Sequence, residues 1–339
     1  MLLKSAIREV IQAQKEHLEN YDTGVGRHLL GKIRLDTGFV LIITGIRRSG
    51  KSTLLKQLIR KKLPDACFLN FEDPRLTGFE SKDFMKVDEI FSEDPGDPFY
   101  IFDEIQNIKE WEKFIRYKQD SGKKILLTGS NAILLSKEFG TKLTGRHIDY
   151  ELYPFSYSGY LKITRSAPGA DSFMNYLNAG GFPEYLKYGE KEILYRITDD
   201  ILYRDIATRH GIRHLSKLKE LLVYLITNSG KLFSYNKLKN IFSMGSPNTV
   251  SDYISFFEDS YLLFTVPKFS YSVKKQIANP RKIYTIDTGL ASANSLSISK
   301  DLGRRFENLL FIHLRKKYKK IYYYAERGEC DFLGSRLVG

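Results

Sequence analysis

The stretch FVLIITGIRRSGKSTLLKQLI, residues 39–59, joins an apolar run to a glycine-containing turn and then to a segment with apolar residues at helical spacing. Residues 39–44 are apolar and rich in β-branched side chains, which predicts a short buried strand. Residues 53–59 place leucine and isoleucine three and four positions apart, which predicts a helix. A strand, a glycine-rich turn and a helix start bring backbone N–H groups together where an anion binds. The stretch therefore predicts a phosphate-binding loop within an α/β domain.

The turn has the spacing G-x-x-x-x-G-K-S of the Walker A loop. Lys51 is expected to reach the β- and γ-phosphates, and the Ser52 hydroxyl is expected to bind Mg²⁺. Gly45 and Gly50 let the backbone fold around phosphate because they have no Cβ. The residues expected to bind a nucleoside triphosphate are Gly45, Ile46, Arg47, Arg48, Ser49, Gly50, Lys51, Ser52 and Thr53.

A second apolar segment, residues 99–102, ends in two adjacent carboxylates, Asp103 and Glu104. Asp103 has the position of a Walker B carboxylate, which holds Mg²⁺ through water or from its second shell. Glu104 is placed to orient or deprotonate an attacking water, so it is a candidate catalytic residue that favours hydrolysis over binding alone. The alternative is that the two acids cap the following segment.

A third element is the apolar segment 125–128 with the small polar residues that follow it. Ser130 or Asn131 is predicted to contact the γ-phosphate or the attacking water, and Asn131 is the candidate catalytic residue. The alternative is a Gly-Ser-Asn turn that caps the next helix.

Short apolar segments alternate with helix-like segments from residue 39 to residue 152, after an amphipathic helix predicted over residues 1–20. Such alternation is typical of a parallel, doubly wound sheet, so the predicted fold class is α/β. The expected strands are residues 39–44, 66–71, 98–102, 124–128 and 147–152. The expected helices between them are residues 53–62, 81–91, 108–119 and 131–138.

These motifs together resemble those of AAA+-like P-loop ATPases, whose sheet has an additional strand. More narrowly, the chain resembles a group of bacterial and archaeal ATPases with an uncharacterised C-terminal domain. The resemblance implies ATP binding and hydrolysis, and a sheet in which the strand 124–128 lies between the P-loop strand and the Walker B strand. It covers most of the chain through GIRRSGKSTLL (45–55), FLNFEDPRL (68–76), YIFDEIQN (100–107), LLTGSNA (126–132), LTGRH (143–147), LYPFSYSGYL (152–161), GGFPEYL (180–186) and YTIDTGLAS (284–292).

Hydrolysis in such enzymes commonly needs an arginine on the γ-phosphate, from the same chain or from a neighbour. Arg146, Arg204 and Arg209 are the candidates, and Arg209 is the one we select as catalytic. The alternative for each is an ordinary ion pair with Asp205 or another nearby acid. The bound nucleotide is expected to be ATP, because the segment Asn236-Lys237-Leu238-Lys239 lacks the aspartate of a guanine-recognition motif.

Positive charge is concentrated towards the C-terminus. The net charge of the chain is +13, yet residues 1–200 hold 30 basic and 29 acidic residues, whereas residues 201–339 hold 23 basic and 11 acidic residues. A basic region fits nucleic acid or an acidic protein, and a solvated surface is the alternative. Helices predicted at 215–227, 234–242 and 247–259, followed by a strand at 261–266, favour a winged-helix-like arrangement. Its third helix has no Lys or Arg, and its exposed side is expected to carry three acids, which argues against base readout by this helix.

The last segment, residues 281–339, is expected to form a strand, a helix and a second strand, and resembles the start of a restriction-endonuclease-like domain. In such nucleases a helix Glu, a strand Asp and a later (Asp/Glu)-x-Lys motif bind Mg²⁺. Glu307 and Asp331 match the first two, but none of the eight residues after Asp331 forms the third. We therefore expect no nuclease activity, and expect both carboxylates to pair with the basic cluster 315–320.

More than one domain is expected from 339 residues. We divide the chain into a P-loop ATPase domain with an N-terminal helix (1–153), a helical lid-like region (154–212), a winged-helix-like domain (213–270) and an incomplete restriction-endonuclease-like segment (271–339).

Four functions remain open. The first is an Mg²⁺-dependent ATPase that switches or remodels a bound partner, with a homo-oligomer as a candidate assembly. The others are a nucleotide-gated adaptor with little turnover, a DNA-binding regulator and a small-molecule kinase. The only two cysteines, Cys67 and Cys330, belong to no metal or disulfide motif, and no apolar run is long enough to span a membrane. A cytoplasmic location is expected.

Overall fold

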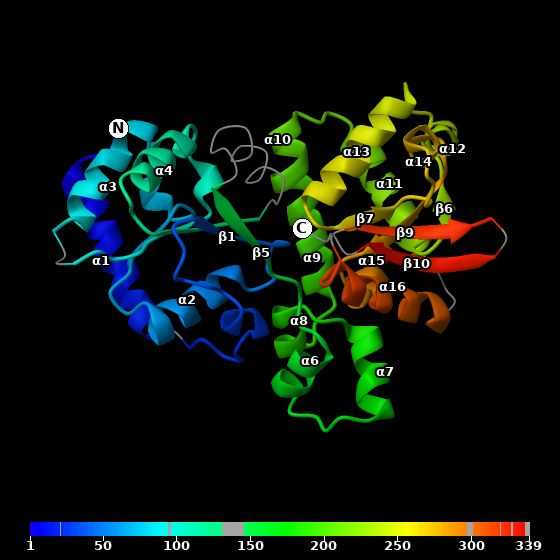
Figure 1. Cartoon of the computed structure of the whole chain (residues 1–339), viewed down its shortest axis with the longest axis horizontal. Helices are drawn as coiled ribbons and strands as arrows, with labels where there is room; N and C mark the ends of the chain where they lie inside the picture. The colour runs from blue at the N-terminus through cyan, green and yellow to red at the C-terminus, as the bar shows by residue number, and fades with distance from the viewer. Residues whose placement is uncertain are drawn as a thin grey trace. The chain divides into compact units, whose positions relative to one another are not determined.

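The chain divides into two compact units, Met1–Leu152 and Tyr153–Gly339 (Figure 1). The structure is a computed structural model, and it describes residues 1–20, 22–93, 96–130, 146–296, 301–318, 320–326 and 328–335. The helix expected at 131–138 lies outside these residues. No helix in the described ranges has the length and apolar character that crossing a membrane requires.

The first unit contains a five-stranded parallel sheet with the order β2-β3-β4-β1-β5. The strand β4 therefore lies between β1, which precedes the phosphate loop, and β3, which ends in Asp103, as the resemblance implied. This confirms the predicted α/β fold class. The strands are β1 (Val40–Thr44), β2 (Cys67–Asn70), β3 (Tyr100–Asp103), β4 (Ile125–Gly129) and β5 (His147–Glu151).

Hydrophobic cores cover both faces of this sheet, because successive strand residues point to opposite sides. On β1, Val40 and Ile42 join one core, whereas Leu41 and Ile43 join the other. The first core includes residues of α1, α3 and α4, and the second includes Leu54, Leu55 and Leu58 of α2. The helices are α1 (Lys4–Asn20), α2 (Lys51–Lys62), α3 (Phe84–Phe91) and α4 (Trp111–Asp120), with 3-10 turns η1 (His28–Gly31), η2 (Pro74–Leu76), η3 (Ser81–Asp83) and η4 (Ile105–Asn107).

The second unit begins with helices and continues with two small antiparallel sheets, β6-β8-β7 and β10-β9. Its first helices are α6 (Tyr157–Thr164), α7 (Ala170–Ala179), α8 (Pro183–Tyr188), α9 (Glu192–Asp200), the π-helix η5 (Ile201–Ala207) and α10 (Thr208–His210). The rest comprises α11 (Leu215–Thr227), β6 (Leu232–Phe233), α12 (Tyr235–Ile241), α13 (Pro247–Asp259), β7 (Leu263–Val266), α14 (Val273–Ala278), β8 (Arg281–Thr285), α15 (Thr288–Asn294), α16 (Leu302–Arg315), β9 (Lys320–Ala325) and β10 (Glu329–Ser335).

Asp287 joins two of the quoted sequence motifs in this unit. Its Oδ2 accepts the backbone N–H of Gly181 at 2.7 Å, while its Oδ1 accepts the N–H of Leu290 at 2.9 Å. Gly180 has a φ of +71°, and a Cβ there would lie 2.0 Å from Asp287 Oδ1. Burial raises the pKa of Asp287 to about 6, because its cost outweighs the stabilisation of the carboxylate by backbone N–H groups and by the charge of Lys316. The segments GGFPEYL and YTIDTGLAS therefore form one buried contact.

Candidate nucleotide-binding site

The phosphate loop of the first unit has the backbone geometry that its glycines predict. Gly45 has a φ of +147°, and a Cβ at this position would lie 2.2 Å from the carbonyl oxygen of Leu152. Gly50 adopts a φ of +95° immediately before α2 begins at Lys51. The first turn of α2 thus faces the loop, and its unpaired N–H groups and positive dipole end favour a bound anion.

Lys51 is buried and lies across this loop. Its amine donates to the carbonyl of Gly45 at 3.0 Å and to that of Ile46 at 3.4 Å, and lies 3.8 Å from Oε1 of Glu104. A buried ammonium requires such partners because it has lost its hydration. The structure therefore brings together Lys51, predicted to contact the phosphates, and Glu104, predicted to act on the attacking water, although they lie 53 positions apart in the sequence.

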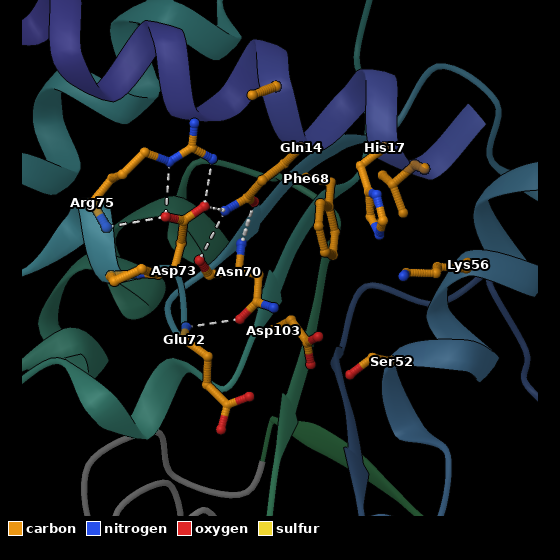
Figure 2. Close-up of a pocket in the computed structure, with 13 residues that line it drawn as sticks. Gln14, His17, Ser52, Lys56, Phe68, Asn70, Glu72, Asp73, Arg75 and Asp103 are labelled. Carbon is orange, nitrogen blue, oxygen red and sulfur yellow. Dashed lines mark hydrogen bonds and ion pairs between the residues drawn. The ribbon is translucent and has the colours of Figure 1, made fainter. Parts of the chain in front are cut away.

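Asp103 is completely buried at the end of β3. Burial and the neighbouring charge of Glu104 raise its pKa to about 6, while the nearby hydroxyls of Thr128 and Ser52 and the charge of Lys51 oppose the shift. The Thr128 hydroxyl donates to Oδ1, whereas Oδ2 has no hydrogen-bond partner among the described residues. Figure 2 shows the Ser52 hydroxyl and this carboxylate facing each other. An unsatisfied buried carboxylate oxygen beside a hydroxyl is a suitable place for a cation.

Glu104 occupies a strained backbone position, with a φ of +55° that non-glycine residues seldom adopt. Its N–H donates to Oγ1 of Thr128 at 3.1 Å, and its carboxylate accepts from the side chain of Gln106. Thr128 therefore holds both acids at once. The sequence motifs did not identify Thr128 or Gln106 as site residues. The one feature that could have indicated Thr128 is that it is a polar residue at the end of an apolar strand.

The third predicted element is described in part. Ser130 is buried, and its hydroxyl lies 3.5 Å from Nε2 of Gln106, which also binds Glu104. Ser130 thus belongs to the same polar group as Glu104. Asn131, the candidate catalytic residue of this element, lies outside the described residues.

The three candidate arginines have different surroundings. Arg146 is 63% exposed, and its Nη1 lies 3.2 Å from Oδ1 of Asp120, which matches the ion-pair alternative. Arg204 pairs with Asp200, with Nε 3.5 Å from Oδ1. Nη1 of Arg209 is buried and has no hydrogen-bond partner within the described ranges. Arg204 and Arg209 belong to the second unit.

A pocket of about 430 Å³ extends from Ser52 and Asp103 towards helix α1. Gln14 and His17 of α1 line it, together with Lys56 of α2 (Figure 2). The Gln14 side chain donates to the carbonyl of Asn70 at 3.1 Å and accepts the Asn70 N–H at 2.8 Å. Helix α1 therefore forms one wall beside the candidate cation position. This wall was not predicted, because hydrophobic periodicity identifies only the buried face of α1.

The candidate nuclease carboxylates correct one prediction. Among the described residues, Glu307 and Asp331 form no ion pair with the basic cluster 315–320, and their partners lie on β8 instead. Lys282 lies 2.5 Å from Oδ1 of Asp331 and 3.6 Å from Oε1 of Glu307, and the Tyr284 hydroxyl donates to Oε1 of Glu307 at 2.6 Å. The fold places these residues together, although β8 and β10 are distant in sequence. Among the described residues, no group of three or more acidic, His or Cys side chains has the arrangement of a metal site.

Helix α13 corrects a second expectation. Of its three acids, Asp259 is buried, and Glu258 accepts the N–H and the hydroxyl of Thr265 at 2.8 and 2.9 Å. Only Asp252 is exposed. The helix contains no Lys or Arg, so we still do not expect it to read DNA bases.

Comparison with known proteins finds similarity to two family models and to several proteins. A family model described as an AAA domain matches residues 37–161, and a model described as Domain of unknown function (DUF8612) matches residues 170–301. An uncharacterised protein of Haemophilus influenzae is 29% identical over 326 residues, covering 89% of this chain and 80% of that protein. A solved STAND-class signal-transduction ATPase with a tetratricopeptide repeat sensor, from Pyrococcus horikoshii, is 15% identical with a TM-score of 0.35, covering 86% of this chain and 46% of that chain.

An uncharacterised protein of Methanocaldococcus jannaschii is 34% identical over 327 residues, and the match covers 89% of this chain and 73% of that protein. The match extends over both units, and the AAA model matches the part that contains Lys51, Asp103 and Glu104. The chain therefore belongs to the family of this archaeal protein, and it carries an AAA domain.

Proposed function

We propose that the first unit binds ATP with Mg²⁺ and hydrolyses it. The observation that carries the proposal is the convergence of Lys51, Ser52, Asp103 and Glu104 at the carboxyl ends of β1 and β3, the two parallel strands that flank β4. Ligands of open α/β sheets bind at the carboxyl ends of the strands, where these side chains lie. The AAA family match supports nucleotide binding by this unit.

Each residue has a distinct role in this proposal. The incoming phosphates replace the carbonyls of Gly45 and Ile46 as partners of the Lys51 amine, since a phosphate oxygen is the stronger acceptor. Ser52 and Asp103 would hold Mg²⁺, which fits the unpartnered Oδ2 of Asp103. The ion neutralises charge on the β- and γ-phosphates when it is bound.

Glu104 is the proposed base. Its carboxylate orients an attacking water and accepts a proton from it, while Gln106 and the strained backbone fix its direction. The ion pair with Lys51 is then exchanged for contacts with phosphate and water. The proposed arginine that stabilises the γ-phosphate is Arg209, supplied by the same chain or by a second copy.

A Glu104→Gln variant tests directly whether the first unit hydrolyses ATP. It should retain nucleotide binding but hydrolyse ATP about 10²–10⁴-fold more slowly in single-turnover measurements, because the amide cannot accept the proton. Glu19→Gln is a matched control, since it makes the same substitution at an exposed carboxylate of α1 that does not line the pocket. If the parent protein and the variant bind ATP equally and neither hydrolyses it, the ATPase proposal fails.

The second candidate is a nucleotide-gated adaptor with little turnover. The ion pair of Arg146 with Asp120 favours it, because this arginine of the first unit already has a partner. In this candidate the bound nucleotide changes the partners of Lys51 and thereby shifts the loop conformation. In either case we propose that the basic second unit, with its winged-helix-like order of α11, α12, α13 and the sheet β6-β8-β7, contacts the partner that is switched or remodelled.

A further inference from the structure

An exposed arm, residues 267–280, connects β7 to β8 in the second unit. Tyr323 of β9 holds both of its ends. The Tyr323 N–H donates to the carbonyl of Pro267 at 3.1 Å, and its own carbonyl accepts the N–H of Phe269 at 2.7 Å. The Tyr323 hydroxyl donates to the carbonyl of Pro280 at 2.7 Å. The base of the arm is therefore fixed, while the residues between Phe269 and Pro280 carry α14.

The middle of the arm exposes apolar side chains. Tyr271 is 97% exposed, Val273 is 69% exposed and Ile277 is 65% exposed. Val273 and Ile277 are four residues apart on α14, so they lie on one side of the helix. Exposed apolar residues that cluster in this way mark an interaction surface, because leaving them in water is unfavourable.

The charge of the arm indicates an anionic partner. Residues 267–280 contain three lysines, Lys268, Lys274 and Lys275, and no acidic residue. Of these, Lys268 lies 3.8 Å from Oε1 of Glu326. The side chains of Lys274 and Lys275 are exposed, and within the described residues neither forms an ion pair. These two lysines therefore add uncompensated positive charge beside the apolar residues.

We infer that this arm binds duplex DNA. Proteins that bind the minor groove insert apolar side chains between base steps and neutralise the flanking phosphates with Lys or Arg. Ile277 and Val273 supply the apolar contact, and Lys274 and Lys275 supply the phosphate contacts. Helix α13 offers no such charge, so the arm rather than that helix makes the contact. The two apolar residues lie on a six-residue helix, so they can insert between base pairs as a wedge. Their apolar area is small for binding to a membrane surface.

The test uses the full chain and a fluorescent duplex of about 30 base pairs, titrated at salt concentrations from about 50 to 200 mM. Lys274→Gln with Lys275→Gln should weaken binding roughly tenfold or more at about 0.1 M salt and reduce the slope of log K against log salt by about 2. Ile277→Ser should weaken binding with the slope unchanged, because it removes no charge. Lys162→Gln with Lys191→Gln is the charge-matched control on the same unit, and both lysines are exposed.

The outcomes separate the alternatives. Loss of binding in the arm variants, with control-pair binding and ATP hydrolysis unchanged, supports the inference and is independent of whether the site in the first unit hydrolyses ATP. Equal weakening by the arm pair and the control pair overturns it, since general charge would then suffice. Absence of DNA binding at the lowest salt also overturns it, as does binding only to vesicles containing phosphatidylserine or only to polyglutamate.

Discussion

Lys51 in the first unit and Lys282 in the second are both buried and both face carboxylates. The two groups differ in whether their buried polar atoms have hydrogen-bond partners. Beside Lys51, one oxygen of Asp103 has no hydrogen-bond partner in the described structure, and the backbone of Glu104 is strained. A pocket of about 430 Å³ begins at Asp103. Unpaired buried atoms and strain are costly, so their presence together indicates a site that a ligand completes.

The group around Lys282 is more nearly self-contained. Burial lowers the pKa of Lys282, but the hydrogen bond to Asp331 and the charges of Glu307, Asp331 and Glu329 outweigh it, so the pKa is raised. Tyr284 donates a further hydrogen bond to Glu307. None of these carboxylates has an unpaired buried oxygen among the residues described. The same residue types therefore form a candidate reactive site in one unit and a structural ion pair in the other.

The largest effect is expected from Lys51→Ala. Loss of the amine removes the main positive charge on the β- and γ-phosphates, so ATP hydrolysis should fall by about 10²–10³-fold or more. Nucleotide affinity should fall with it, which fluorescent-nucleotide titration would measure. The change in the free energy of unfolding should be smaller than the change in the activation free energy of ATP hydrolysis. If the rate of ATP hydrolysis is unchanged, Lys51 does not differ from Lys282 in function.

Lys282→Met should have the converse effect. The substitution keeps most of the apolar stem but leaves Glu307 and Asp331 facing each other, so we expect a loss of about 1–3 kcal/mol in the free energy of unfolding. ATP hydrolysis should stay within about twofold of the parent rate. Chemical denaturation measures the first quantity.

Lys219→Met is the control for this variant, because Lys219 forms an exposed pair with Asp199 at 2.7 Å. Exposed pairs contribute about 0–1 kcal/mol, so this variant should be close to the parent in stability. A strong loss of ATP hydrolysis in Lys282→Met, with folding intact, would show that the second group is functional after all.

The smallest expected effect is the pH dependence of Mg²⁺ binding. The pKa of Asp103 is raised from its ordinary value to about 6, so the carboxyl is increasingly protonated as pH falls below 6. Because a metal ion binds the deprotonated form, the apparent Mg²⁺ affinity should fall up to about tenfold per pH unit below pH 6 and be nearly constant above pH 7. Titrations of Mg²⁺ at fixed nucleotide, between pH 5 and pH 8, measure this.

Asp103→Asn is the matched variant for this experiment, since it removes the titrating group but keeps the shape. Its Mg²⁺ affinity should be low and should lose the dependence on pH below 6. If the parent protein binds Mg²⁺ equally well at pH 5 and pH 7, Asp103 is not the group that holds the ion.

Local patterns predicted most of the first unit because its strands and helices follow hydrophobic periodicity. The strands β1, β3 and β4 lie within one or two residues of the predicted ranges, and Lys51, Ser52, Asp103 and Glu104 were all selected from motifs. The same reasoning missed the short elements β6, α14 and α15 of the second unit, since elements of two to seven residues carry too little periodicity to recognise.

The polar residues around the site were less predictable. Thr128 and Gln106 act through contacts with Asp103 and Glu104, and such contacts depend on which strands are neighbours rather than on a local pattern. The partners of Glu307 and Asp331 were wrong for the same reason: charge density along the chain suggested 315–320, but strand pairing brought Lys282.

The sequence by itself determined that residues 39–59 form a strand, a phosphate loop and a helix, because glycine spacing and apolar periodicity are local properties. Tertiary structure alone decided that Thr128 binds both acids, that α1 lines the pocket, and that Asp287 joins two motifs more than 100 residues apart. Those contacts depend on strand order and helix packing, which bring distant residues into hydrogen-bond range.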